Sequence, residues 1–360
     1  MSNARELAQI PSTPSGRRNL IINGAMTVAQ RGTSISITNT TGYTLDRFKI
    51  GRGSNYNFDV DVSQSSDAPT DFANSLKIDV QATATPSASD NATLEYFIEG
   101  QDLTHLNYGS SSGKYVVLSF WVKSNKTGTY GCQFKLDSNS RNFTNSYTIS
   151  SSNTWEKKTI TINPDTAGAA FADNNLVGAR IIWHLSTGPD DILSGNRDWT
   201  ADALFRSVTG QVNLLDSTSN EFYLTGVQLE VGTVATEFEH RSFGEELALC
   251  QRYYTKFDFP QTTPFFLSHK QTGNTVRSTV TTPVPMRTTP TINASGQPYI
   301  RYNWDSGSNL IIDDGTSLTV IGSSLDANRF TVSNSDVTSV GNNVGAVLAY
   351  AGDLECDSEL

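Results

Sequence analysis

Charged residues are scarce in this chain, and no cluster of basic ones occurs. Asp, Glu, Lys and Arg make up 17% of the 360 residues, against about a quarter in an average globular protein. The formal net charge is −10, so phosphate backbones would repel the chain, which argues against nucleic acid as a partner. No apolar run is long enough to span a bilayer, and the polar start MSNARELAQI is not a secretion signal. We therefore expect synthesis in the cytoplasm and no membrane insertion.

Residues that bind metals or form covalent intermediates are also few. The three cysteines are odd in number and lack CxxC spacing, which argues against a disulfide framework and a zinc site. The four histidines form no HExxH motif, and the chain has no GxSxG, Walker or GxGxxG motif. The sequence predicts neither a catalytic residue, nor a cofactor, nor a metal.

Acidic residues leave two alternatives open. Carboxylates that pair in space would suit glycoside hydrolysis, and the visible pairs are Asp190 with Asp191 and Asp313 with Asp314. The loop that contains Asp190 also carries Asn196 and Asp198, which are oxygen ligands of the kind calcium prefers. Their spacing fits no defined calcium loop, so a solvated turn is the favoured interpretation.

Hydroxyl and amide residues are abundant instead: 111 residues are Ser, Thr or Asn, and 27 are Gly. Apolar residues alternate with polar ones over several short segments, which is the period of a strand with one buried face. These segments are 76–80, 116–122, 130–136 and 177–185. Turn-forming loops separate them, so residues 19–241 are predicted to form an all-β, jelly-roll-like antiparallel β-sandwich.

One helix is predicted after this sandwich. Ser242 and Glu245 have the spacing of a capping box, and Leu247, Cys250 and Tyr254 then share one face. We place the helix at 243–256, within a linking segment 242–258 that ends before Pro260.

A second, smaller β-sandwich is predicted over 259–360. Three prolines in TTPVPMRTTPT indicate an edge or a crossover. Short strands are expected at 299–304, 309–313, 318–321, 329–332 and 344–349.

Aromatic residues near polar loops suggest carbohydrate binding, because sugar rings present flat C–H faces that stack on Trp and Tyr. Alternation along a strand means that either Tyr299 and Arg301 or Tyr302 and Trp304 face outward. The candidate glycan-binding residues are Trp199, Tyr299, Arg301, Tyr302 and Trp304.

Several segments resemble the tail-fibre and receptor-binding virion proteins of tailed bacteriophages. RRNLIINGAMTVAQRGTS (17–34), followed by YTLDRF, resembles their characteristic start, and SFWVKS (119–124) resembles a long sandwich strand. LTGVQLEVGTVATEFEHRSFGEELALCQRYY (224–254) is the most specific segment, and PVPMRTTPT and AGDLECDSEL resemble the second domain. From residues alone, segment 224–254 is interpreted as a scaffold with a bulge at Gly226.

The resemblance implies a non-catalytic virion component, commonly trimeric, that adsorbs to a host-surface glycan. We expect a tail fibre or receptor-binding subunit; the alternatives are a polysaccharide-degrading tail spike and a head or tail decoration protein without host contact. A homotrimer is expected, with candidate contacts at 265–267 and 344–349.

The segment 1–18 is predicted to be a flexible arm that anchors the protein to other virion proteins. Arginines would pair with acids of the partner, and Leu7 and Ile10 would fill an apolar groove. The anchoring candidates are Arg5, Leu7, Ile10, Arg17 and Arg18.

Overall fold

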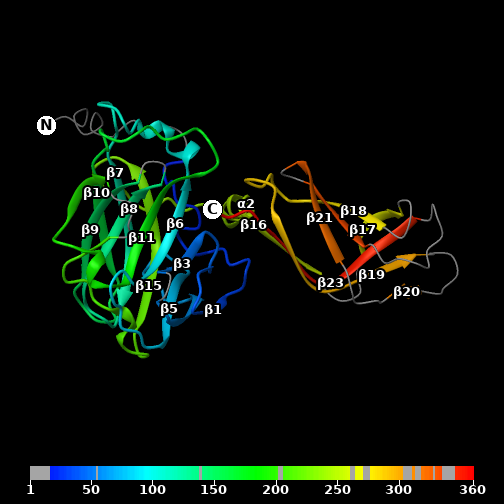
Figure 1. Cartoon of the computed structure of the whole chain (residues 1–360), viewed down its shortest axis with the longest axis horizontal. Helices are drawn as coiled ribbons and strands as arrows, with labels where there is room; N and C mark the ends of the chain where they lie inside the picture. The colour runs from blue at the N-terminus through cyan, green and yellow to red at the C-terminus, as the bar shows by residue number, and fades with distance from the viewer. Residues whose placement is uncertain are drawn as a thin grey trace. The chain divides into compact units, whose positions relative to one another are not determined.

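The computed structural model describes residues 17–53, 56–137, 140–201, 206–259, 264–270, 276–302, 310–312, 318–326, 329–334 and 345–360. Side chains are described to residue 258, from 279 to 293 and from 353 onward, within those ranges. The chain divides into two units, Met1–Glu246 and Leu247–Leu360 (Figure 1). Within the described ranges, no helix has the length and apolar character that crossing a membrane requires.

The first unit contains two large sheets, in which every strand pair is antiparallel. The six-stranded sheet has, in order, β1 (Ser34–Thr38), β4 (Asp59–Ser65), β5 (Ser75–Ala82), β15 (Glu221–Val231), β7 (Val116–Ser124) and β10 (Glu156–Ile162). The seven-stranded sheet has β13 (Arg197–Ala201), β9 (Arg141–Ile149), β8 (Gly128–Leu136), β11 (Val177–Thr187), β6 (Asn91–Glu99), β3 (Phe48–Arg52) and β2 (Gly42–Tyr43).

Shorter elements connect these strands. A small parallel pair is formed by β12 (Ile192–Leu193) and β14 (Ser207–Val208). Four 3-10 turns lie at Gly100–Asp102, Thr104–Leu106, Pro189–Asp191 and Leu214–Asp216.

The core lies between the two sheets and follows the predicted alternation. Phe120 of β7 and Trp183 of β11 are both fully buried and meet edge to face at 5.8 Å. Phe48 of β3 also packs on Trp183, with ring centroids 6.4 Å apart. The all-β, jelly-roll-like antiparallel sandwich predicted from the sequence is therefore confirmed.

The predicted bulge in β15 is also present. Gly226 has a φ of 60°, and the register between β15 and β7 shifts between Thr225 and Gln228. Leu224, Val227 and Leu229 are all fully buried on either side of this shift, so the bulge keeps both halves of the strand in phase with the core.

The predicted helix begins where expected but is shorter than predicted. The Glu245 backbone N–H donates to Ser242 Oγ at 3.3 Å, which caps the helix α2 (Phe243–Gln251). The residues expected in its last turn instead form the strand β16 (Tyr254–Phe259), which pairs with β23 (Gly345–Asp357). Tyr254 and Thr255 are aromatic and β-branched residues that suit a strand, and both are buried beside β23.

The second unit is built on one eight-stranded sheet. Its strands are β16, β17 (Pro264–Lys270), β18 (Val276–Thr281), β19 (Thr291–Tyr302), β20 (Leu310–Ile312), β21 (Leu318–Asp326), β22 (Arg329–Asn334) and β23. β19 and β21 are distant in the strand order yet contact each other, so the sheet folds back on itself. The proline-containing segment joins β18 to β19 as the predicted crossover.

Candidate functional site

Segments 17–34 and 224–254, which both resemble parts of phage virion proteins, contact each other in the first unit. The Glu239 carboxylate accepts from the backbone N–H groups of Arg18 and Asn19, at 3.1 and 2.7 Å. The Arg241 guanidinium donates to the carbonyls of Asn19 and Ile21, and it pairs with Glu239 at 3.2 Å. The hydrogen bonds from Arg18 and Asn19 lower the pKa of Glu239 despite the opposing effect of its burial. Residues about 220 positions apart in the sequence are therefore joined by a charged network that acts as scaffold.

This network also engages the two described residues among the anchoring candidates. Arg18 lies 3.4 Å from the Glu230 carboxylate and donates to the Glu237 carbonyl. Arg17 donates to the carbonyls of Asn19 and Leu20. Arg18 thus pairs with an acid of its own chain, and the predicted pairing of the arm's arginines with acids of a partner stays a prediction. Arg5, Leu7 and Ile10 lie outside the described residues.

A cavity of about 460 Å³ opens on the outer face of the six-stranded sheet. Strands β7, β10 and β15 form its base, and two loops from distant parts of the sequence border it. The lining residues are Thr70, Asp71, Phe72, Ser119, Trp121, Lys157, Gly226, Glu237, Phe238 and His240.

Aromatic rings make up the apolar part of this cavity. Phe72 packs edge to face on Phe238 at 5.0 Å, and His240 lies 5.3 Å from Phe72 and 4.9 Å from Phe238. Trp121 comes from the sheet itself and is half-buried. An indole and a phenyl ring that remain partly accessible offer flat faces to a ligand.

The bulge at Gly226 brings these rings close to the backbone. A Cβ atom at this position would lie 2.7 Å from Phe72 Cζ and 2.9 Å from Trp121 Cδ1. Only a glycine fits here, because its φ of 60° also strains any other residue. The bulge predicted from the sequence therefore shapes the cavity as well as the strand.

Polar groups surround the aromatic rings. Ser119 lies on β7, and Lys157 is exposed on β10, opposite Trp121 in the register. Asp71 and Glu237 are exposed on the bordering loops. These hydroxyl, ammonium and carboxylate groups can hydrogen-bond the hydroxyl groups of a ligand that stacks on the rings.

The predicted glycan-binding residues are divided between the two units. Trp199 of β13 belongs to the first unit, where its indole packs on the rings of Tyr108, Phe134 and Phe143 at 5.7 to 6.0 Å. Its Nε1 donates to the Asn163 carbonyl at 2.7 Å. This half-buried ring is therefore held by ring packing and by a hydrogen bond within the first unit.

The other predicted glycan-binding residues belong to the second unit. Tyr299, Arg301 and Tyr302 lie on β19, opposite Ala349, Val347 and Ala346 of β23. Their side chains and all of Trp304 lie outside the described part of the chain. Glycan binding by these four residues and by Trp199 stays a prediction.

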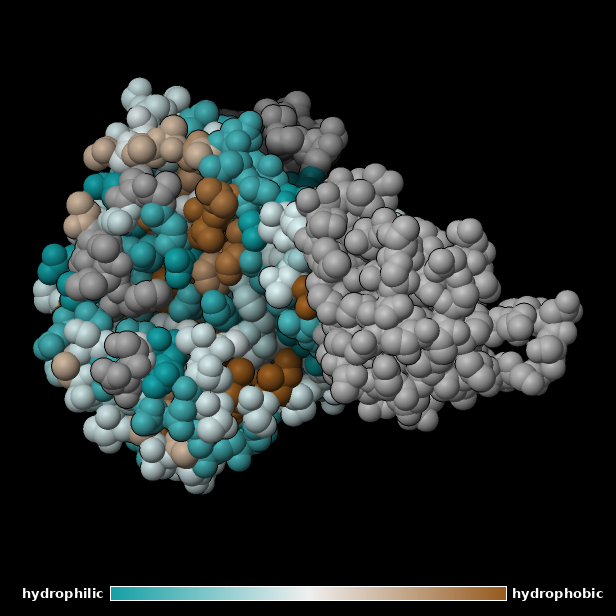
Figure 2. All heavy atoms as spheres, turned by 45° about the vertical axis from the view of Figure 1, so that its right-hand side comes forward, coloured by the Kyte–Doolittle hydropathy of each residue, from teal (hydrophilic) through white to brown (hydrophobic). Residues whose placement is uncertain are grey.

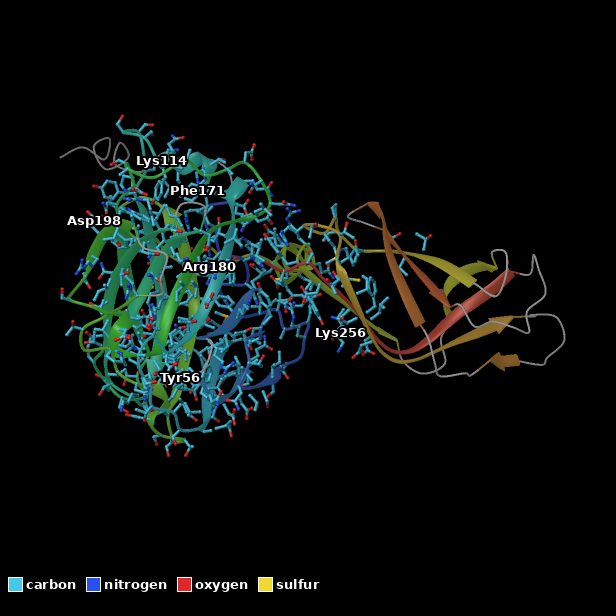
Figure 3. All side chains as sticks on the ribbon, in the orientation of Figure 1. Tyr56, Lys114, Phe171, Arg180, Asp198 and Lys256 are labelled. Atoms are coloured by element: carbon cyan, nitrogen blue, oxygen red, sulfur yellow. The ribbon has the colours of Figure 1, made fainter. Side chains whose placement is uncertain are left out.

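The loop that contains Asp190, Asp191 and Asp198 is not solvated throughout, because an ion pair holds part of it. Asp191 is buried and pairs with Arg206 at 3.1 Å, whereas Asp190 is exposed. Asp198 lies on the edge strand β13 (Figure 3) and accepts from the Asn163 amide at 2.9 Å. Across the described ranges, no group of three or more His, Cys, Asp or Glu residues is arranged to hold a metal ion.

No pattern in the sequence marks the cavity residues as a site. Phe72 and Phe238 are 166 positions apart, and Phe238 belongs to segment 224–254, which is interpreted as scaffold. The bulge at Gly226 was one available signal, because a glycine at a phase change marks a close approach of other groups. The segments 119–124 and 224–254, which contain further cavity residues, are singled out only for their resemblance.

No protein-family model matches the chain, and no curated protein sequence matches it. Among solved structures, it is similar to the enzymatically active domain of tailspike protein 4 of bacteriophage CBA120, with 14% identity and a TM-score of 0.32. The match covers 59% of this chain and 21% of that chain.

Two further similar structures come from Clostridium thermocellum. One is a family 11 carbohydrate-binding module in complex with a β-1,3-1,4-mixed-linked tetrasaccharide, with 10% identity, a TM-score of 0.28 and coverage of 58% of this chain and 98% of that one. The other is the CBM22-1–GH10 part of xylanase 10B complexed with xylohexaose, with 11% identity, a TM-score of 0.29 and coverage of 62% and 30%. Similarity at this level does not determine a ligand, which depends on the residues of the site.

Proposed function

We propose that the first unit binds carbohydrate non-covalently, and without catalysis, in the cavity on the six-stranded sheet. The observation that carries this proposal is the combination of Trp121 and Phe72 with Ser119, Asp71 and Lys157 around one cavity of about 460 Å³. A sugar ring needs both kinds of group, because its C–H faces stack on aromatic rings while its hydroxyls require hydrogen-bond partners.

The face of the first unit that Figure 2 draws has no large apolar area among the residues coloured there. The visible surface of the first unit is mostly hydrophilic or near neutral, with brown apolar patches that are small and separate (Figure 2). A lipid or an apolar partner helix would need a larger continuous apolar surface than this.

We further propose that the protein is a bacteriophage virion component, a tail fibre or receptor-binding subunit, and that the carbohydrate is a host-surface glycan. The resemblance of segments 17–34 and 224–254 to such proteins supports this setting. The Glu239–Arg241 network joins these same two segments, which supports their interpretation as a shared scaffold. Segment 224–254 also contributes Gly226, Glu237, Phe238 and His240 to the cavity.

The test uses the purified full-length protein on an array of bacterial surface polysaccharides and oligosaccharides. We expect wild-type protein to bind at least one glycan, and Trp121→Ala to weaken that binding about tenfold or more, because it removes the stacking face. Tyr115→Ala is the matched control, since Tyr115 is a 46% exposed aromatic residue about six positions before Trp121 along the same chain segment. Absence of binding across the array, or equal binding by Trp121→Ala, contradicts the proposal.

The polysaccharide-degrading alternative is tested with the same reagents. The bound polysaccharide is incubated with the protein, and its chain length is followed by size-exclusion chromatography. Constant chain length is expected, and steady depolymerisation contradicts a non-catalytic role.

A further inference from the structure

A second accessible indole lies next to the cavity on the same face of the six-stranded sheet. In the register of β10 with β7, Lys157 is opposite Trp121 and Glu156 is opposite Val122. Continuing this register by one residue places Trp155 opposite Lys123. Trp155 and Trp121 therefore occupy diagonal positions of one sheet face, where Cα atoms are about 7–8 Å apart.

The Trp155 ring is held in place by its neighbours while it stays half-buried. Its Nε1 donates to Asp67 Oδ1 at 3.1 Å, and its edge packs on the ring of Tyr223 at 6.1 Å. The Lys123 ammonium lies 5.4 Å from the Trp155 ring and 4.1 Å from the Tyr223 ring. A ring fixed in this way loses little conformational entropy when a ligand stacks on it.

The charged groups around Trp155 are paired with one another. Lys123 binds Asp67, and Lys77 binds Glu221 at 2.7 Å. Tyr223 Oη also donates to Glu221 at 2.8 Å. The hydrogen bonds from Lys123 and Lys77 lower the pKa of Asp67 and of Glu221, respectively. Both carboxylates are thus ionised and neutralised, so this region presents an indole face without an excess of charge.

We propose that Trp155 forms a second sugar subsite, and that the ligand is a neutral glycan chain of two or more sugar units lying across β7 and β10. This inference rests on the proposed function of the cavity. The two indoles are neighbours on a continuous sheet face, so one chain can stack on both, whereas a single sugar unit can stack on only one of them.

The test measures how affinity depends on ligand length. The probe is a ladder of oligosaccharides of one to eight units, prepared by partial acid hydrolysis of the polysaccharide that wild-type protein binds on the array. Titration calorimetry is expected to show that Trp155→Ala weakens binding of the longer members about fivefold to tenfold. Binding of the single unit should change less than twofold, whereas Trp121→Ala weakens binding of every member.

Two further variants separate binding from folding. Trp155→Phe keeps a ring on Tyr223 and should retain part of the affinity for the longer members, whereas Tyr115→Ala should leave all affinities unchanged. Circular dichroism checks that each variant is folded. If a folded Trp155→Ala protein binds long and short members as wild type does, the second subsite is overturned while the cavity proposal stands. If wild-type protein binds no glycan on the array, both fall.

Discussion

Gly226 is the residue on which the geometry of the cavity depends most directly. Its positive φ costs an alanine about 1–2 kcal/mol, and an added Cβ would also collide with Phe72 and Trp121. We expect Gly226→Ala to lower the free energy of unfolding by about 2–4 kcal/mol in chemical denaturation and to weaken glycan binding. Gly195→Ala is a matched control, because Gly195 has a φ of 74° with nothing within 4 Å of the added Cβ. Equal losses of stability and binding in the two variants would contradict a role for the collision.

His184 of β11 should make the stability of the fold depend on pH. It is fully buried, its Nδ1 lies 3.2 Å from Thr187 Oγ1, and desolvation lowers its pKa to about 3. The unfolded chain has a histidine pKa near 6.5 and binds a proton that the folded chain does not, so stability is lost as the pH falls from about 6.5 toward 3.

The corresponding variant is His184→Gln, studied by urea denaturation between pH 7 and pH 4. The stability difference between wild type and variant should change with a slope approaching about 1.4 kcal/mol per pH unit below pH 6. Burial raises the pKa of Asp46 and of Glu95, which gives the opposite pH dependence, but both groups are common to the two proteins. Parallel curves for the two proteins would contradict the prediction.

At the scale of elements, segment 17–24 and strand β15 stabilise each other through Asn19. The Asn19 amide donates to the Val227 carbonyl at 3.1 Å, and its Oδ1 accepts from the N–H groups of Ile21 and Leu229. Asn19→Ala leaves these buried groups without partners, each at about 1–3 kcal/mol, and we expect a total loss of about 3–5 kcal/mol in the free energy of unfolding. Asn57→Ala, which removes one exposed bond to Arg52, should cost less than about 0.5 kcal/mol. Similar losses in both variants would show that the Asn19 contacts are not stabilising.

Elements set by local signals could be predicted from the sequence, whereas those set by distant pairing could not. Strands such as 130–136 were predictable because alternation is a local signal, and the start of α2 was predictable because Ser242 and Glu245 form its cap. Its end was not, because the pairing of Tyr254 with Asp357 is decided by a strand about a hundred residues away. The cavity depends on the register between β7, β10 and β15 and on two loops that the sequence does not place together. The indole of Trp199 looked available in a polar loop, yet it packs on Phe134 of β8, on Phe143 of β9 and on Tyr108 in the turn after Leu106.

At the scale of the whole molecule, the proposed adsorption through weak sugar sites would require several linked copies. One carbohydrate site binds weakly, and linking copies raises the effective concentration of the remaining sites once the first is occupied. In the second unit, β17 and β23 pair with each other and with further strands. Residues 346–349 of β23 are paired on both sides, with β17 and β19, so a contact between copies at this strand would use side-chain faces. Phe266 and Leu267 of β17 pair with β23, whereas the pairing of β17 with β18 begins at Ser268.

We predict that the purified protein is a homotrimer. Native mass spectrometry and light scattering at micromolar concentration should both give a mass near three times 39.1 kDa. Trp121→Ala should leave this mass unchanged, because the cavity lies in the first unit. It should nevertheless abolish avid binding to an immobilised polysaccharide. Avidity depends on all three sites, so the loss of affinity at each site lowers the binding of the trimer more than the binding of one site in solution. A mass near 39.1 kDa would contradict the trimer. Equal affinity for soluble oligosaccharide and immobilised polysaccharide would contradict the argument that linked copies raise the affinity.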